Sequence, residues 1–152
     1  MITRYAEVTD AVLSALRSSQ DLAGVLIVDG PPGSLTLAAD FIYVGWTGSE
    51  DDELAGNISQ AYHDLGPAAT RDETVTIECI VQSVRGDDLM DVARLRCVTM
   101  LGAVETILRS DPTVGLAGLL RVELSDASVR QVRNADGIGV EISFTLEATS
   151  II

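Results

Sequence analysis

The chain has no lysine, a single histidine and only two cysteines among its 152 residues. One histidine with no nucleophile at a recognised spacing favours neither hydrolytic catalysis nor a histidine-based metal site. Cys79 and Cys97 fall on apolar faces of a predicted strand and a predicted helix, so we expect buried, reduced thiols that react slowly. We therefore expect no enzyme activity, no cofactor and no metal.

Aromatic residues and long apolar runs are also scarce. Aromatics are 4% of a chain that is 47% hydrophobic, so valine, isoleucine, leucine and alanine must build its core. No apolar run approaches the ~18 residues that a membrane span needs, and no signal peptide opens the sequence. We expect a single domain over residues 1–152 that is assembled in the cytoplasm and contacts no membrane.

Positive charge is the third shortage. Ten arginines face 23 acidic residues, which gives a formal net charge of −13. Such a field repels phosphate backbones, so we expect no direct recognition of nucleic acid. The acidic excess has two interpretations: solubility at high concentration, or a surface that meets a basic partner or lines an acidic ring.

Periodicity then predicts two helices and a set of strands. Helical spacing of apolar residues runs from Tyr5 to about Ser18 and again from Asp87–Asp88 to Ser110. Asn134-Ala135-Asp136-Gly137 is a hairpin signal. The expected strands are 25–28, 40–46, 73–84, 119–124, 128–134 and 138–149. This pattern favours an α+β fold with a mixed or antiparallel sheet and both helices on one face.

Apolar and polar residues alternate almost perfectly along the last predicted strand. Its apolar residues recur at every second position, so they should share one buried face. They are Ile138, Val140, Ile142, Phe144, Leu146 and Ala148.

Residues 47–71 carry no clear period, although 54–65 has the length for a short helical turn. We expect a long loop here, mobile in the free subunit and ordered on contact with a neighbour. Its acidic start lacks the spacing and glycine of a calcium loop, so a solvated charge run is the simpler interpretation. These candidate contact residues are Glu50, Asp51, Asp52 and Glu53, and His63 lies in the same loop.

Six arginines follow residue 90, and they have two interpretations. They either pair locally with the many carboxylates or pair across a subunit interface, where arginine is enriched. Arg130 and Arg133 should point to opposite faces of one strand. The candidate interface residues are Arg121, Arg130 and Arg133.

The order of these elements resembles a known family. The similarity lies in a helix before Val25-Leu26-Ile27-Val28-Asp29-Gly30-Pro31-Pro32, a strand ending in Val44-Gly45, and a helix ending at Asp111-Pro112-Thr113-Val114-Gly115. The whole chain resembles the tail terminator, or tail-completion, proteins of long-tailed siphovirus-type phages. This resemblance implies a sheet with two helices on one side and no catalytic residues.

The resemblance also implies a structural role in the virion tail. Proteins of this family form a ring, expected to be a hexamer, on the head-proximal end of the tail tube. The ring stops polymerisation of the tail-tube protein and presents a surface to the head connector. Two alternatives stay open: another head–tail connector, neck or tail-tube protein, and a small non-catalytic ligand-binding domain.

Overall fold

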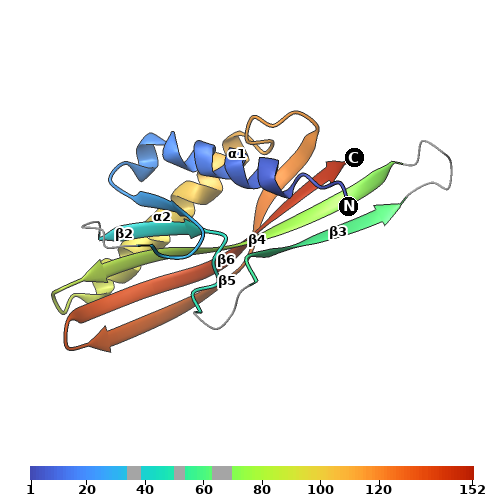
Figure 1. The fold of residues 1–152 in the computed structure, drawn as a ribbon. Helices are drawn as coiled ribbons and strands as arrows, with labels where there is room; N and C mark the ends of the chain where they lie inside the picture. Colours follow the sequence, from blue (N-terminus) through green and yellow to red (C-terminus); the bar gives the residue numbers. More distant parts are fainter. Residues whose placement is uncertain (34–38, 50–53, 63–69) are drawn as a thin grey trace.

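The fold is a two-layer α+β arrangement with a mixed sheet of six strands and two α-helices on one of its faces (Figure 1). The computed structural model describes residues 1–33, 39–49, 54–62 and 70–152. Its elements are α1 (Tyr5–Arg17), the short 3-10 helix η1 (Gln20–Leu22), β1 (Leu26–Asp29), β2 (Asp40–Val44), β3 (Gly56–Tyr62), β4 (Arg71–Arg85), α2 (Met90–Ser110), β5 (Leu119–Asn134) and β6 (Gly137–Ile151). The predicted fold class is confirmed.

The strand order is β1-β2-β4-β6-β5, and β3 pairs with β4 beside β2. Only β1 and β2 are parallel; the other pairs are antiparallel. β4 and β6 therefore form the centre of the sheet, with β5 at one edge and β1 and β3 at the other. Within the described residues, neither helix is long and apolar enough to cross a membrane.

The core lies between the helices and one face of the sheet. The six alternating residues of β6 predicted to share a face are all buried, and Phe144 is 2% exposed. Cys79 and Cys97 are free and buried, as expected. Burial raises the pKa of the Cys79 thiol to about 12 and that of Cys97 to about 11, so neither thiol is appreciably ionised near neutral pH.

A buried carboxylate holds the start of α1 against the sheet. Glu73 on β4 is fully buried and accepts a hydrogen bond from the backbone N–H of Arg4 at 2.8 Å and from Gln60 Nε2 at 2.7 Å. Desolvation raises the pKa of Glu73, but these bonds and one with Thr3 outweigh it, so the net pKa is lowered. A long-range polar contact thus fixes where the first helix begins.

The predicted loop over 47–71 is wrong in its middle. Residues 56–62 form β3, which pairs with β4 from Gly56 opposite Ile77 to Tyr62 opposite Arg71. Its inward positions include glycine and glutamine instead of a run of apolar residues, so period-2 hydrophobicity is weak there. Gly56 sits close to Thr76 and Tyr5, and Gln60 binds Glu73. Polar and backbone contacts hold this strand together with a single apolar contact, that of the partly buried Ile58 with the core.

The separate strands predicted at 119–124 and 128–134 are one long strand, β5. A register shift lies between Ser125 and Ala127, and Asp126 has a positive φ of 39°. This β-bulge lets the strand bend without leaving the ladder. The predicted hairpin follows, with Asn134 opposite Gly137.

The second helix starts later than the predicted Asp87–Asp88. α2 begins at Met90, because Asp87 is held before the helix by Arg85 at 2.7 Å and accepts the Leu89 N–H. The predicted end at Ser110 is confirmed.

No helix of the described residues covers the other face of the sheet. Its middle is polar, with threonine, serine and glutamate alternating along β4 and β6. At the β2 side of this face, Phe41, Tyr43 and Ile80 form a small apolar cluster, and Val28 and Trp46 pack against it. Tyr43 meets Trp46 edge-on at 4.9 Å between ring centroids. We call this the open face.

Candidate interaction surface

Strand β5 is an unpaired sheet edge, and it carries all three predicted interface arginines. It hydrogen-bonds to β6 on one side, and no other described strand pairs with it. Arg130 lies opposite Glu141 and Arg133 opposite Ile138, which places them on the open face and the helix-covered face respectively. The prediction that these two side chains point to opposite faces is confirmed.

Local ion pairing accounts for four of the six arginines after residue 90. Arg109 pairs with Glu105 at 2.8 Å along α2, and Arg121 pairs with Glu123 at 3.0 Å along β5. The remaining two pairs join distant segments, and they are Arg96 with Asp40 at 2.8 Å and Arg133 with Asp88 at 2.6 Å. The pairs of Arg109, Arg121 and Arg133 are exposed and add little stability, whereas the Arg96–Asp40 pair is partly buried.

Arg94 and Arg130 have no carboxylate partner among the described residues. Arg94 donates from Nε to Gln131 Oε1 at 2.7 Å, which ties α2 to the helix-covered side of β5. Arg130 is exposed on the opposite side of the same strand. Two arginines therefore flank the β5 edge from above and below, in a protein with a large negative charge.

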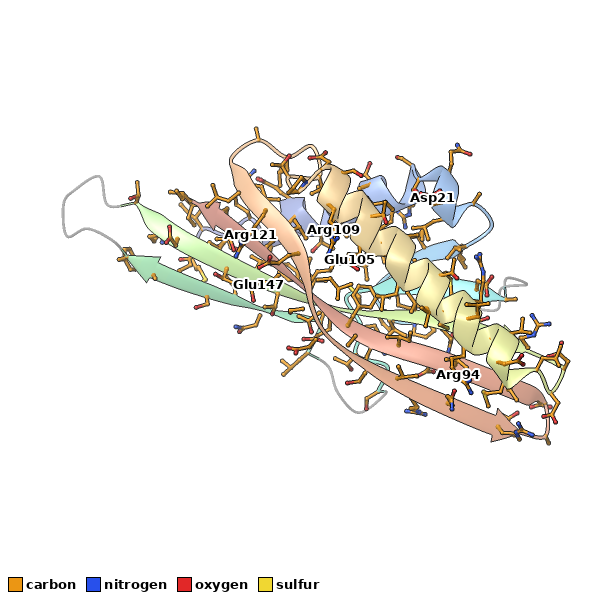
Figure 2. The ribbon with its side chains drawn as sticks, turned by 180° about the vertical axis from the view of Figure 1, so that it is seen from behind. Asp21, Arg94, Glu105, Arg109, Arg121 and Glu147 are labelled. Atoms are coloured by element: carbon orange, nitrogen blue, oxygen red, sulfur yellow. The ribbon has the colours of Figure 1, made fainter. Side chains whose placement is uncertain are left out.

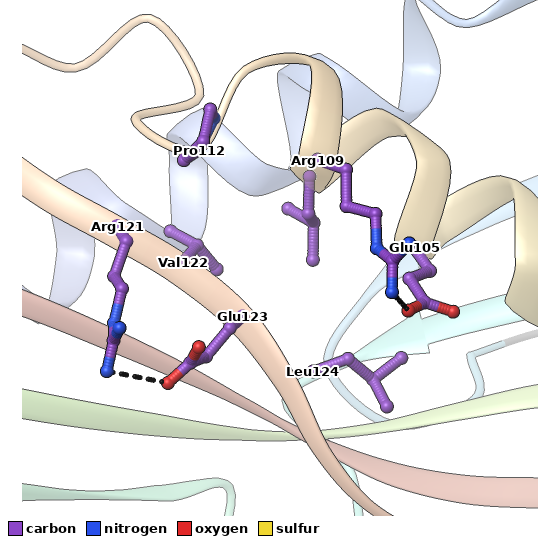
Figure 3. A pocket seen from close by; sticks show the side chains of 8 residues that line it. Glu105, Arg109, Pro112, Arg121, Val122, Glu123 and Leu124 are labelled. Atoms are coloured by element: carbon purple, nitrogen blue, oxygen red, sulfur yellow. Dashed lines mark ion pairs between the residues drawn. The ribbon is translucent and has the colours of Figure 1, made fainter.

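A groove of about 400 Å³ lies where the C-terminal end of α2 meets the first half of β5 (Figure 3). Leu108, Pro112, Val122 and Leu124 supply its apolar surface, and the ion pairs Arg109–Glu105 and Arg121–Glu123 stand at its two sides. Arg121 thus lies at a docking-type surface with an apolar centre and charged sides. The groove holds no nucleophile beside a base.

Exposed apolar side chains continue along the same side of the molecule. On α2, Leu95 is 67% and Val98 53% exposed, and Val129 on β5 is 60% exposed. Val98 lies one helical turn beyond Arg94, on the flank of α2 that faces β5. We call this side of the molecule, formed by α2 and the outer edge of β5, the β5 side.

The opposite side is formed by α1 and β1, and we call it the β1 side. Figure 2 places Asp21 of η1 across α2 from Arg121 on β5. A groove of about 390 Å³ opens here, lined by Asp10, Leu13, Ser14, Arg17, Ser18 and Asp29. Arg17 Nη2 donates to the Ile27 carbonyl at 3.2 Å, so an outward-facing backbone group of β1 is already occupied. Asp10 and Asp29 pair with no described cation.

The described residues contain no group of three or more histidine, cysteine or acidic side chains that could hold a metal ion. The candidate contact residues Glu50, Asp51, Asp52 and Glu53, together with His63, lie outside the described residues. Of the six arginines after residue 90, the sequence indicated three of the β5 side but not Arg94, whose place beside β5 depends on how α2 packs. It also missed Asp10 and Asp29, which only the fold brings together.

Comparison with solved structures shows a likeness in fold. No protein-family model matches the sequence, and no curated protein matches it significantly. Among solved structures, a chain described as "Virion of native gene transfer agent (GTA) particle" matches with a TM-score of 0.55 and 20% sequence identity. The match covers 98% of this chain and 100% of that chain. At this identity the likeness shows a shared fold over the full length of both chains.

Proposed function

We propose that this chain is a non-catalytic structural protein of a phage-like virion, and specifically a tail terminator. Residues 1–152 act as one domain that assembles into a ring, expected to be hexameric, on the head-proximal end of the tail tube. The ring stops tube growth and receives the head connector. The observation that carries this proposal is the full-length fold likeness to a chain of a virion particle.

The surface chemistry supports assembly. An unpaired edge strand, a groove with an apolar centre and charged sides, and several exposed apolar residues all lie on the β5 side. Exposed apolar side chains gathered on one side of a small protein are typical of an interface. A head-to-tail contact repeated by rotation closes into a ring without leaving either surface exposed.

The open face suits a channel wall through which DNA passes. Its middle carries Glu78, Glu141 and Glu147 among threonines and serines, and Glu123 of β5 lies directly opposite Glu147. Acidic side chains repel the phosphate backbone, so DNA would slide past without being held. In the proposed ring this face points to the axis and the helices point outward.

Electron microscopy and native mass spectrometry of the purified protein test the proposal. We expect single closed rings with a central opening and a mass that is a fixed multiple of the subunit. A protein that stays monomeric up to its solubility limit would contradict a ring-forming role and would favour a ligand-binding domain.

The same images separate the terminator from its nearest rival. A tail-tube protein stacks into tubes of indefinite length, whereas a terminator remains a single ring because one of its two end surfaces does not accept another copy. Long tubes from this chain alone would exclude the terminator and keep the virion-protein class. A further assay adds preformed rings to polymerising tail-tube protein, and the expected result is shorter tubes.

A further inference from the structure

Resting on the proposed ring, we propose that the β5 side of one copy docks against the β1 side of the next copy. Arg94, on the helix-covered side of the β5 edge, meets Asp10 and Asp29, which line the groove between α1 and β1 on that same side of the sheet. Arg130 reaches the seam from the open face. The occupant of each surface is therefore a second copy of this chain, joined head to tail. The argument has three steps: charge, available partners and topology.

Charge is distributed unevenly across the molecule. From Met90 to Asn134, the segment that builds the β5 side, six arginines stand against five acidic residues. From Tyr5 to Asp29, the segment that builds the β1 side, one arginine stands against four acidic residues. In a chain of net charge −13, the segment that builds the β5 side is thus slightly basic. The β5 side of one copy and the β1 side of another are therefore complementary in charge. Two β5 sides, or two β1 sides, would not be.

The groups with no partner inside the subunit also match across the two sides. Arg94 and Arg130 pair with no described carboxylate, and Asp10 and Asp29 pair with no described cation. Every other arginine of the β5 side already has a carboxylate within the subunit. Apolar surface accompanies both sets, because Val129 precedes Arg130 and the half-exposed Leu26 begins β1. Charge and apolar contact are thus available together at both sides.

Topology allows this contact to repeat. β5 and β1 are the two ends of the strand order, so a subunit presents one surface at each end. Arg17 already occupies the Ile27 carbonyl on β1, so the seam at β1 is made by side chains and not by adding a strand there. A contact between unlike surfaces at opposite ends is the heterologous type that closes rings.

A charge-swap experiment tests the seam with the full-length protein. One variant carries Arg94→Glu with Arg130→Glu, and a second carries Asp10→Arg with Asp29→Arg. Each alone places like charges at every seam, and we expect the concentration for half-assembly to rise about tenfold or more. Mixed in equal amounts, the two variants restore unlike charges at every seam, so we expect rings of alternating subunits. Native mass spectrometry reads both results, since the two variants differ in mass.

The matched control is Arg71→Glu with Arg85→Glu. It makes the same change of net charge at the first and last residues of β4, a central strand of the sheet, so its rings should form as in the wild type. Because Arg85 also holds Asp87 before α2, the stability of this variant is compared with that of the swap variants. Circular dichroism melts show whether each variant folds. Wild-type rings together with unimpaired rings from either swap variant would overturn the seam and leave the ring proposal standing. Folded swap variants that fail alone and also fail when mixed would overturn this pairing. A wild type that never forms a ring would overturn the proposed function itself.

Discussion

The two faces of the sheet are built from alternate residues of the same strands, yet one face is buried beneath the helices and the other is not. On β6 the even-numbered residues from Ile138 to Ser150 are buried under the helices, while the odd-numbered ones are half-buried and mostly polar. Apolar burial on one face supplies the stability that a small domain needs. Residues of the open face and of the sheet edges contribute less to this stability, so their side chains can serve contacts with other molecules.

The largest effect is expected from a comparison of two neighbouring alanine substitutions on β6. Phe144→Ala removes a ring that is 2% exposed beneath the helices, and it should lower the free energy of unfolding by about 3–5 kcal/mol. Thr145→Ala, one residue later on the open face, should cost less than about 1 kcal/mol although its hydroxyl donates to Glu78. Chemical denaturation measures both. Equal losses would mean that the open face contributes as much stability as the covered one.

A second test concerns the buried carboxylate beneath α1. Glu73→Gln removes a charge that accepts hydrogen bonds from the Arg4 N–H and Gln60, and we expect a loss of about 1.5–3 kcal/mol at neutral pH. The folded-state pKa of Glu73 is lowered from its ordinary value of 4.5. Its contribution is therefore fully present above the unfolded-state pKa and disappears as the pH falls through the folded-state value.

Melts of the wild type and of Glu73→Gln across acidic pH should accordingly converge as the pH decreases. The control is Asp72→Asn, on the adjacent open-face position of β4. A stability gap for Glu73→Gln that stays constant with pH would show that the carboxylate does not titrate differently in the folded state.

A smaller effect is expected where the chain crosses the open face. Gly48 has φ of +86°, and an added Cβ would lie 2.5 Å from Ile80 Cδ1. Gly48→Ala should therefore destabilise by about 1–2 kcal/mol, mainly through the left-handed backbone. Gly102→Ala on the exposed surface of α2 meets nothing within 4 Å, and it should be neutral or stabilising in the same thermal melt.

The smallest effect is expected for alkylation of the two thiols, which should hardly react under native conditions. Cys79 and Cys97 are buried with raised pKa values of about 12 and 11. Alkylation at neutral pH should be slow for both and should become complete only after denaturation. Rapid labelling of the native protein at either position would show that the covered face opens locally.

Sequence reasoning succeeded where apolar burial alone determines the structure. The period of β6 placed Phe144 and its neighbours on the covered face because nothing polar interrupts the alternation. It failed for β3, where Gln60 faces inward to a buried carboxylate instead of to an apolar core. It also divided β5, because Ser125 and Asp126 read as a turn although a bulge carries the ladder through them. The pairing of Arg133 with Asp88 and the nearness of Asp10 to Asp29 depend on tertiary packing, which has no local signal.

The bulge in β5 has a consequence for solubility. A long unpaired edge strand is a template on which other chains can stack into fibres. At Asp126 the positive φ and the register shift interrupt the regular spacing of outward backbone groups. An incoming strand can follow only one half of the edge before its hydrogen bonds lose alignment. The bulge thus limits amyloid-like growth along an edge strand of 16 residues.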